Sequence, residues 1–199
     1  ADRLVSGGFE RTLILGPAGS GKSVLAHVIR ALACKRMPTF LLELDVLTAT
    51  VDTGRIDLLE CAAKHAARIT GEDEASQFLQ LLQHESWILI LDGLDEIPET
   101  QRDRVILAAN ELMARYRGSI RVVLTGRPPV FGLRDYGLKT DTELDLLPLS
   151  CSEADAVVTQ IVTDDAERKR FREFLTRYGF DRTQPGIDGC HYLLMTTYR

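Results

Sequence analysis

The sequence has few cysteines, and none is arranged as a metal ligand. Cys34, Cys61, Cys151 and Cys190 are scattered, without a Cys-x-x-Cys pair or a matching pair of histidines. Structural zinc sites use such closely spaced ligands, so we expect no zinc site. The simplest interpretation is that all four are free, buried, reduced thiols of a cytoplasmic protein.

Long apolar runs and blocks of one charge are also missing. No run approaches the roughly 18 apolar residues of a membrane helix, and no charged-then-apolar leader is present. The 24 basic and 29 acidic residues are interleaved, for a net charge of −5. We therefore expect no membrane partner, and nothing indicates nucleic-acid binding. The 199 residues suffice for one domain with a substantial core.

Short apolar segments alternate with helix-like segments along most of the chain. The apolar runs predict five strands, at residues 11–15, 39–44, 88–92, 120–125 and 143–147. Several of them are apolar without alternation, which is typical of strands covered on both faces. The alternation predicts an α/β fold, with a five-stranded, mostly parallel sheet flanked by helices.

Three helices are predicted between these strands, near residues 21–33, 55–70 and 102–116. Their expected core-facing residues are Val24, Leu25, Val28, Ile29 and Leu32 in the first, Leu59, Ala62, Ala63 and Ala66 in the second, and Val105, Ala108, Ala109, Leu112, Met113 and Tyr116 in the third. His27 and His65 lie on these helices and are expected to be exposed. Trp87, before the third strand, is interpreted as a packing residue.

The pattern changes from Pro148 onward. Ser150 and Glu153 fit a helix capping box, and a further helix is predicted around Phe171 to Tyr178. We predict an α/β core over residues 1–148 and a small helical subdomain over residues 149–199. A last apolar helix is predicted to begin near Cys190 and to be cut off by the chain end, so we expect this subdomain to be truncated and the chain to be part of a longer protein.

The turn after the first strand reads GPAGSGKS, a full match to the phosphate-binding pattern G-x-x-x-x-G-K-[ST]. Its glycines let the backbone wrap around phosphate oxygens, while loop N–H groups and the helix N-terminus attract the anion. Lys22 is expected to reach the β- and γ-phosphates, and the Ser23 hydroxyl to bind Mg²⁺. A glycine-rich turn that only caps a helix is the alternative, which this strand–turn–helix context disfavours. The predicted nucleotide-binding residues are Gly16, Pro17, Ala18, Gly19, Ser20, Gly21, Lys22 and Ser23.

Three carboxylates follow the third strand in the stretch SWILILDGLDEIP. Ligands bind at the carboxyl ends of parallel strands, so Asp92 is predicted to lie at the same sheet edge as the phosphate loop. There it could share a Mg²⁺ ion with Ser23. Asp95 or Glu96 could orient or deprotonate a water that attacks the γ-phosphate. The alternative is a solvated acidic loop, but an unpaired carboxylate at the end of an apolar strand would be costly.

Together, LILGPAGSGKS and ILILDGLDEIP resemble the NACHT family of P-loop NTPases, which belongs to the STAND class and is related to AAA+ ATPases. The doubled acidic motif after the strand is the more specific of the two. Two further segments agree: VVLTGRPP is similar to the family's sensor-1 segment, and ELDLLPLS to the stretch that leads into its helical subdomain. The resemblance extends from about Leu13 to Ile161.

This resemblance implies a set of roles at the predicted site. Asp92 would be the Mg²⁺-linked Walker B acid, Asp95 and Glu96 would support hydrolysis, and Arg127 would sense the γ-phosphate. The cofactors implied are ATP or ADP with Mg²⁺. In the helical subdomain the pattern departs from the family, because His191 and Tyr192 stand near the place where members often have a proline. We interpret these two residues as packing at a helix start.

The function implied is a regulatory switch that binds ATP or ADP and hydrolyses ATP slowly. It would belong to a larger signalling protein for immune or antiviral defence, with fused effector and sensor domains and self-association through the NTPase domain on activation. An AAA+-like motor or loader acting on nucleic acid or protein is the alternative. A phosphotransferase is disfavoured by the two acids beside the strand, and a non-hydrolysing module by intact Lys22, Ser23 and Asp92.

Overall fold

The computed structural model describes residues 10–50, 55–70, 75–127, 139–147, 156, 159–160 and 164–177. The chain divides into two units, one of Ala1–Gly16 with Gly21–Asp145 and one of Pro17–Ser20 with Leu146–Arg199. Ser150, Glu153, His191 and Tyr192 lie outside the described residues, and the predicted domain boundary after residue 148 stays a prediction.

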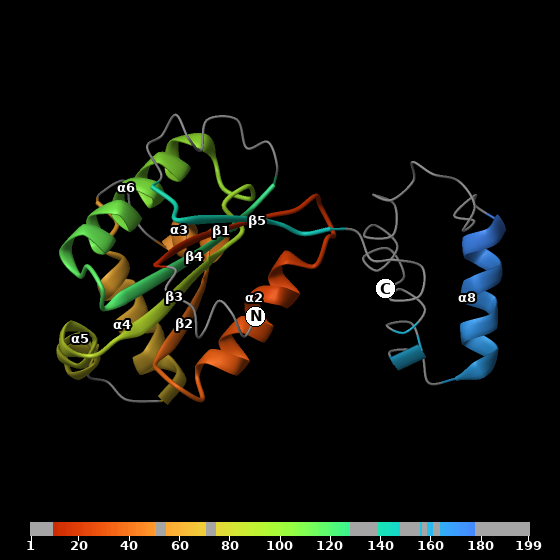
Figure 1. Cartoon of the computed structure of the whole chain (residues 1–199), viewed down its shortest axis with the longest axis horizontal. Coiled ribbons are helices and arrows are strands. Elements are labelled where there is room, and N and C mark those ends of the chain that lie inside the picture. The colour runs from red at the N-terminus through yellow and green to blue at the C-terminus, as the bar shows by residue number, and fades with distance from the viewer. Residues whose placement is uncertain are drawn as a thin grey trace. The chain divides into compact units, whose positions relative to one another are not determined.

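Five parallel strands form the sheet of the first unit (Figure 1). They are β1 (Arg11–Leu15), β2 (Thr39–Glu43), β3 (Trp87–Asp92), β4 (Ile120–Gly126) and β5 (Thr142–Asp145). Their order across the sheet is β2-β3-β4-β1-β5, and all four neighbouring pairs are parallel. The predicted α/β class is confirmed. β4 lies between β1 and β3, with Leu15 opposite Gly126 and Leu91 opposite Leu124.

The central strands are buried because both faces of the sheet are covered. Every residue of β3 is buried, as the unbroken apolar run predicts. Trp87 anchors the start of this strand: its indole N–H donates to the Leu82 carbonyl at 3.0 Å, and its ring meets Phe40 edge-on at 5.6 Å between centroids. The packing role predicted for Trp87 is confirmed.

The three predicted helices are present, together with two that the sequence pattern did not predict. The predicted ones are α2 (Lys22–Ala33), α4 (Leu58–Thr70) and α6 (Glu99–Arg115). The additional ones are α3 (Leu44–Thr50) and α5 (Ala75–His84). The second strand therefore ends at Glu43, because Leu44 already begins α3.

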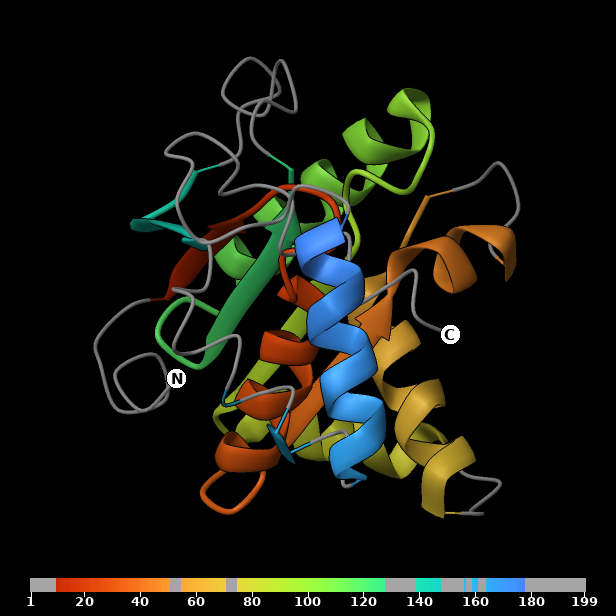
Figure 2. The same ribbon diagram turned by 90° about the vertical axis from the view of Figure 1, so that its right-hand side faces the viewer.

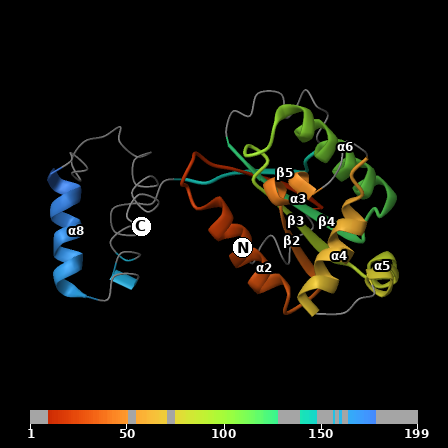
Figure 3. The same ribbon diagram turned by 180° about the vertical axis from the view of Figure 1, so that it is seen from behind.

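Helices cover both faces of the sheet, with α2 on one side and α6 on the other (Figures 1 and 3). The predicted apolar faces of α4 and α6 join one large core cluster with alternate residues of the strands. The opposite face contacts α2, whose buried positions include Ala26, Ile29 and Ala33. The stripe predicted for α2 was therefore partly wrong: Ile29 is buried as predicted, but its buried neighbours are Ala26 and Ala33, whereas Val24 is 68% exposed and Val28 43% exposed.

The environments of three polar residues correct the sequence prediction. Cys34 is exposed where it ends α2, and Cys61 is only partly buried on α4, so these free thiols are not core residues. His27 is exposed as expected, whereas His65 is half-buried on the inner side of α4. Cys151 and Cys190 lie outside the described residues.

In the second unit the structure describes α8 (Asp165–Arg177), the blue helix of Figure 2. Its start is capped by Asp164, whose carboxylate accepts the Glu167 N–H at 2.8 Å. A helix was predicted here, but the side chain of Phe171 lies outside the described part. No helix in the described ranges has the length and hydropathy needed to cross a bilayer.

Candidate functional site

The loop after β1 has the backbone conformation that its glycines predict. The Gly16 N–H donates to the Gly126 carbonyl at 3.1 Å, so the start of the loop, which follows β1, is also hydrogen-bonded to the end of β4. Gly21 has φ of 88°, and a Cβ there would meet nothing within 4 Å. Non-glycine residues rarely adopt this conformation, and the space beside it stays open. The chain then turns directly into α2, which begins at Lys22.

The start of α2 suits an anion. No side chain caps the helix, and its first turn holds no acidic residue, so the positive end of the helix dipole is not neutralised there. The Ser20 hydroxyl in the preceding loop is buried and has no hydrogen-bond partner among the described residues. Buried polar groups are normally satisfied, so such a group fits a loop that binds a ligand.

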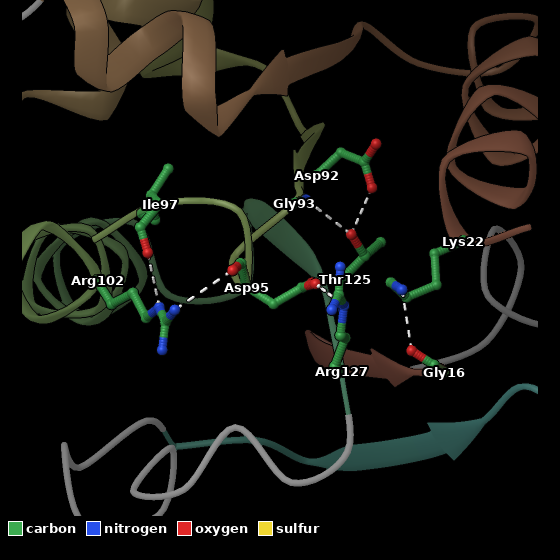
Figure 4. A network of polar contacts seen from close by, with 9 residues as sticks. All are labelled: Gly16, Lys22, Asp92, Gly93, Asp95, Ile97, Arg102, Thr125 and Arg127. Atoms are coloured by element: carbon green, nitrogen blue, oxygen red, sulfur yellow. Dashed lines mark hydrogen bonds and ion pairs between the residues drawn. The ribbon is translucent and has the colours of Figure 1, made fainter. Parts of the chain in front are cut away.

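Lys22 is buried and points back over the loop. Its ammonium group donates to the Gly16 carbonyl at 2.9 Å (Figure 4). Ser23, the predicted Mg²⁺ ligand, is exposed one residue later on the first turn of α2. The structure thus places the predicted phosphate-binding lysine and hydroxyl next to each other at one helix start.

Thr125, at the end of β4, fixes the acidic turn after β3. Its hydroxyl accepts the Gly93 N–H at 2.9 Å and donates to the Asp92 carboxylate (Figure 4). Its carbonyl accepts the Leu94 N–H at 3.0 Å. Asp92 is buried, and this hydroxyl supplies part of the hydrogen bonding that a buried carboxylate requires. Thr125 was not among the predicted site residues, although a hydroxyl ending the apolar run VVL was a signal for it.

Asp95 forms an ion pair with Arg127, two residues beyond Thr125. Its Oδ2 lies 2.5 Å from the Arg127 Nε, and the two side chains are 6% and 52% exposed. Asp95 is therefore a nearly buried carboxylate held by a half-exposed guanidinium. Arg102, in the first turns of α6, supports the same turn by donating to the Ile97 carbonyl at 2.9 Å and the Asp95 carbonyl at 3.3 Å (Figure 4). Arg102 was also missed, since a basic residue early in a helix carries no motif.

The environment of Glu96 links the phosphate loop and the acidic turn after β3 electrostatically. Burial raises the pKa of this carboxyl, and the charges of Asp95, Asp92 and Asp45 raise it further, while Lys22 lowers it. The lysine of the phosphate loop and the acids after β3 therefore lie within electrostatic range of one carboxyl group. Added positive charge there would relieve repulsion among the carboxylates.

A metal ion at this site would need additional ligands from a bound phosphate. In the described part of the chain, no group of three or more His, Cys, Asp or Glu residues could hold a metal ion. Mg²⁺ commonly uses only one or two protein ligands and takes the others from water and phosphate oxygens. The Asp92 carboxylate and Ser23 hydroxyl are oxygen donors of that kind, so they fit Mg²⁺ delivered with a nucleotide.

A family model for the NACHT domain matches residues 10–165, which is most of the chain. The chain belongs to the NACHT family. This is a family of P-loop NTPases, so nucleotide binding and hydrolysis are its general chemistry. Among curated proteins, none matches the chain.

Solved structures with a similar fold share little sequence with this NACHT chain. The Orc1 protein of Aeropyrum pernix, solved in complex with DNA, has a TM-score of 0.55 and 12% identity, covering 84% of the chain and 49% of Orc1. Cdc6p of Pyrobaculum aerophilum has a TM-score of 0.48 and 15% identity, covering 79% and 44%. The chain thus spans less than half the length of either protein. At this identity the likeness to Orc1 shows the fold alone, a P-loop NTPase sheet.

Thr125 gives a first prediction for the NACHT chain. Thr125→Val keeps the side-chain shape but leaves the buried Gly93 N–H without its acceptor, which costs about 1–3 kcal/mol. Thr125→Ser keeps the hydroxyl and loses only a methyl group. We expect Val to lower the free energy of unfolding, measured in urea, by more than Ser does. A Val variant as stable as the Ser variant would contradict the role of this hydroxyl.

Gly93 gives a second prediction. It has φ of +86°, and a Cβ there would lie 3.1 Å from the Glu96 Oε2. Gly118 is a matched control, with φ of +82° and nothing within 4 Å. We expect Gly93→Ala and Gly118→Ala each to lose about 1–2 kcal/mol of stability from backbone strain. Only Gly93→Ala should also slow nucleotide hydrolysis, measured by phosphate release; equal slowing in both variants would assign the effect to stability.

Proposed function

We propose that the chain is the ATP/ADP-dependent switch domain of a larger signalling protein. The observation that carries this proposal is the ion pair between Arg127 and Asp95 at the end of β4. A terminal phosphate held near Lys22 would compete with Asp95 for the guanidinium, since Arg pairs well with phosphate oxygens. ADP lacks that phosphate and would leave the pair intact. ATP would thus break the Arg127–Asp95 ion pair and ADP would leave it intact. A ligand acts as a switch only if it binds two states of the protein with different affinity, and this difference would provide it.

The residues of the chain can also support hydrolysis. Lys22 would bind the β- and γ-phosphates, while Asp92 and Ser23 would hold Mg²⁺. When bound, Mg²⁺ neutralises charge on the phosphate oxygens. Glu96 is the better candidate for accepting a proton from water, because its raised pKa brings it closer to neutral pH. Asp95 would orient the water only after Arg127 has left it, and we infer that this requirement keeps turnover slow.

The biological setting follows from the resemblance to other NACHT proteins. We propose a cytoplasmic immune or antiviral defence protein, in which this domain self-associates on activation. Effector and sensor domains would be fused to it. The same resemblance is the basis for preferring adenine over guanine. In the described structure, no residue that would recognise the base is evident.

A motor or loader acting on nucleic acid is the second candidate. It is favoured by the similarity in fold to Orc1, which was solved with DNA. The chain has a net charge of −5 and no basic block, whereas nucleic-acid binding relies on clustered Lys and Arg. The switch is therefore the function that we propose first.

Turnover distinguishes the two candidates. We expect tight binding of about one adenine nucleotide per chain, with hydrolysis slower than about 1 s⁻¹, the lower end of typical kinase rates. Lys22→Ala should abolish binding in calorimetry because it removes the ammonium group inside the loop. Lys35→Ala, an exposed lysine after α2, is the matched control. Rapid multiple turnover would overturn the switch, and unchanged affinity of Lys22→Ala would overturn the phosphate site.

Asp92 tests the metal role. In Asp92→Ala we expect the Mg²⁺ dependence of ATP binding to be lost, while ADP binding falls much less, because Asp92 would hold the Mg²⁺ that neutralises the additional charge of the γ-phosphate. Calorimetry with and without Mg²⁺ measures both. Asp103→Ala, at an exposed position on α6, is the control. Equal losses for ATP and ADP would contradict the assignment of Asp92 to the metal.

A further inference from the structure

A cavity lies in the first unit, at the β2 edge of the sheet. Its volume is about 620 Å³, and none of its lining residues belongs to the nucleotide site described above. Its walls come from α2, from β2 with the start of α3, and from α4. Cavities of this volume are typical of ligand-binding sites.

The cavity runs along the edge of β2. This strand is the first in the sheet order, so within the described part of the chain only β3 pairs with it. Leu41, Leu42 and Glu43 all line the cavity. Successive side chains of a strand point to opposite faces, so three consecutive residues can line one cavity only where it follows the edge of the strand.

The hydrogen bonds of β2 show which backbone groups face this cavity. The Ile88 N–H donates to the Pro38 carbonyl at 3.0 Å, so the backbone groups of Phe40 and Leu42 also point toward β3. Those of Thr39, Leu41 and Glu43 point outward. An extended segment placed in the cavity would find these outward N–H and C=O groups in position for pairing.

The walls of the cavity combine positive charge with apolar surface. Arg30 of α2 and Lys64 and Arg68 of α4 line it, and Glu43 is the one acid among its lining residues. Lys64 also meets Glu60 at 2.7 Å, but both side chains are exposed and such a pair contributes little.

The apolar part of the lining includes side chains that are accessible to a ligand. Val46 is 50% exposed and Ile69 65% exposed. Large side chains that remain this accessible beside a cavity can contact an occupant. The lining therefore suits a chain that carries both acidic and apolar residues.

His65 of α4 also lines the cavity. It is half-buried, and its Nε2 has no hydrogen-bond partner among the described residues. Burial lowers the pKa of His65, the charges of Arg30 and Arg68 lower it further, and the charge of Glu43 raises it. Arg30 of α2 and Arg68 of α4 therefore act on one side chain in the lining of the cavity.

We propose that this cavity binds an extended, acidic segment of a partner protein, which pairs with β2 as an additional parallel or antiparallel strand. The outward backbone groups of β2 would supply the affinity, and Arg30, Lys64 and Arg68 would select acidic side chains. A small anion would use the charges but leave the strand edge unpaired. The proposal does not depend on the nucleotide-dependent switch.

Hydrogen exchange tests the strand pairing directly. The probe is a capped peptide of alternating glutamate and valine, on the order of seven residues, close to the usual length of a strand. On binding, exchange of the N–H groups of Leu41 and Glu43 should slow at least about tenfold, which is a free-energy difference of roughly 1.4 kcal/mol. The N–H groups of Phe40 and Leu42 should not change, because they already face β3.

Matched controls separate charge from pairing. The same peptide with N-methyl groups on alternate residues keeps its charge but cannot pair, and a lysine version keeps pairing but reverses the charge; we expect neither to bind. The double variant Arg30→Glu, Arg68→Glu should bind the probe at least about tenfold more weakly. Arg117→Glu, at an exposed position after α6, should bind it normally.

Several results would overturn the proposal. These are no binding at millimolar peptide, equal binding of the N-methylated peptide, or binding of citrate without protection of Leu41 and Glu43. In the absence of peptide, the protection of the Leu41 and Glu43 N–H groups could rise with protein concentration. That result would show that a second copy of this chain pairs with the β2 edge instead. Circular dichroism confirms that the double variant is folded; if it is not, the N-methylated peptide alone decides.

Discussion

The end of β4 is the constraint on which the site depends. β4 separates β1 from β3, so the phosphate loop and the acidic turn leave the sheet about 10 Å apart, two strand spacings. Three consecutive residues of this segment connect them: Thr125 bonds to the turn after β3, Gly126 to the start of the phosphate loop, and Arg127 to Asp95. A shift of register in β4 would therefore move both halves of the site at once.

The same arrangement concentrates negative charge. Asp92, Asp95 and Glu96 lie within five residues at the end of one strand, and the pKa of Glu96 is raised by burial and then by the charges of Asp95 and Asp92. The structure offsets part of this repulsion with Thr125 on Asp92 and Arg127 on Asp95. Two neighbouring carboxylates thus have protein partners. A cation brought by a nucleotide would lower the pKa of Glu96, which burial and the charges of Asp95 and Asp92 raise.

The parts of the fold that follow local rules could be predicted from the sequence. The glycine-rich turn between β1 and α2, the buried strand β3 and the apolar face of α6 each depend on residues close in the chain, and all three lie where the sequence predicts them. The helices α3 and α5 were missed because short helices have little intrinsic stability and form here through packing against β2 and α4. The link from Thr125 to Asp92 joins residues 33 positions apart: the apolar run VVL could have pointed to Thr125, but no local pattern names Asp92 as its partner.

The segment after β2 connects the edge cavity with the nucleotide site. Glu43 lines the cavity and stands opposite Asp92 in the β2–β3 register. Two residues later, the charge of Asp45 raises the pKa of Glu96, while the adjacent Val46 and Leu47 line the cavity again. A strand added to β2 would contact the same short segment that acts electrostatically on the acidic turn. Coupling between two binding sites is reciprocal, so an occupant that shifts Asp45 would alter nucleotide affinity, and the nucleotide would alter the affinity for that occupant by the same factor.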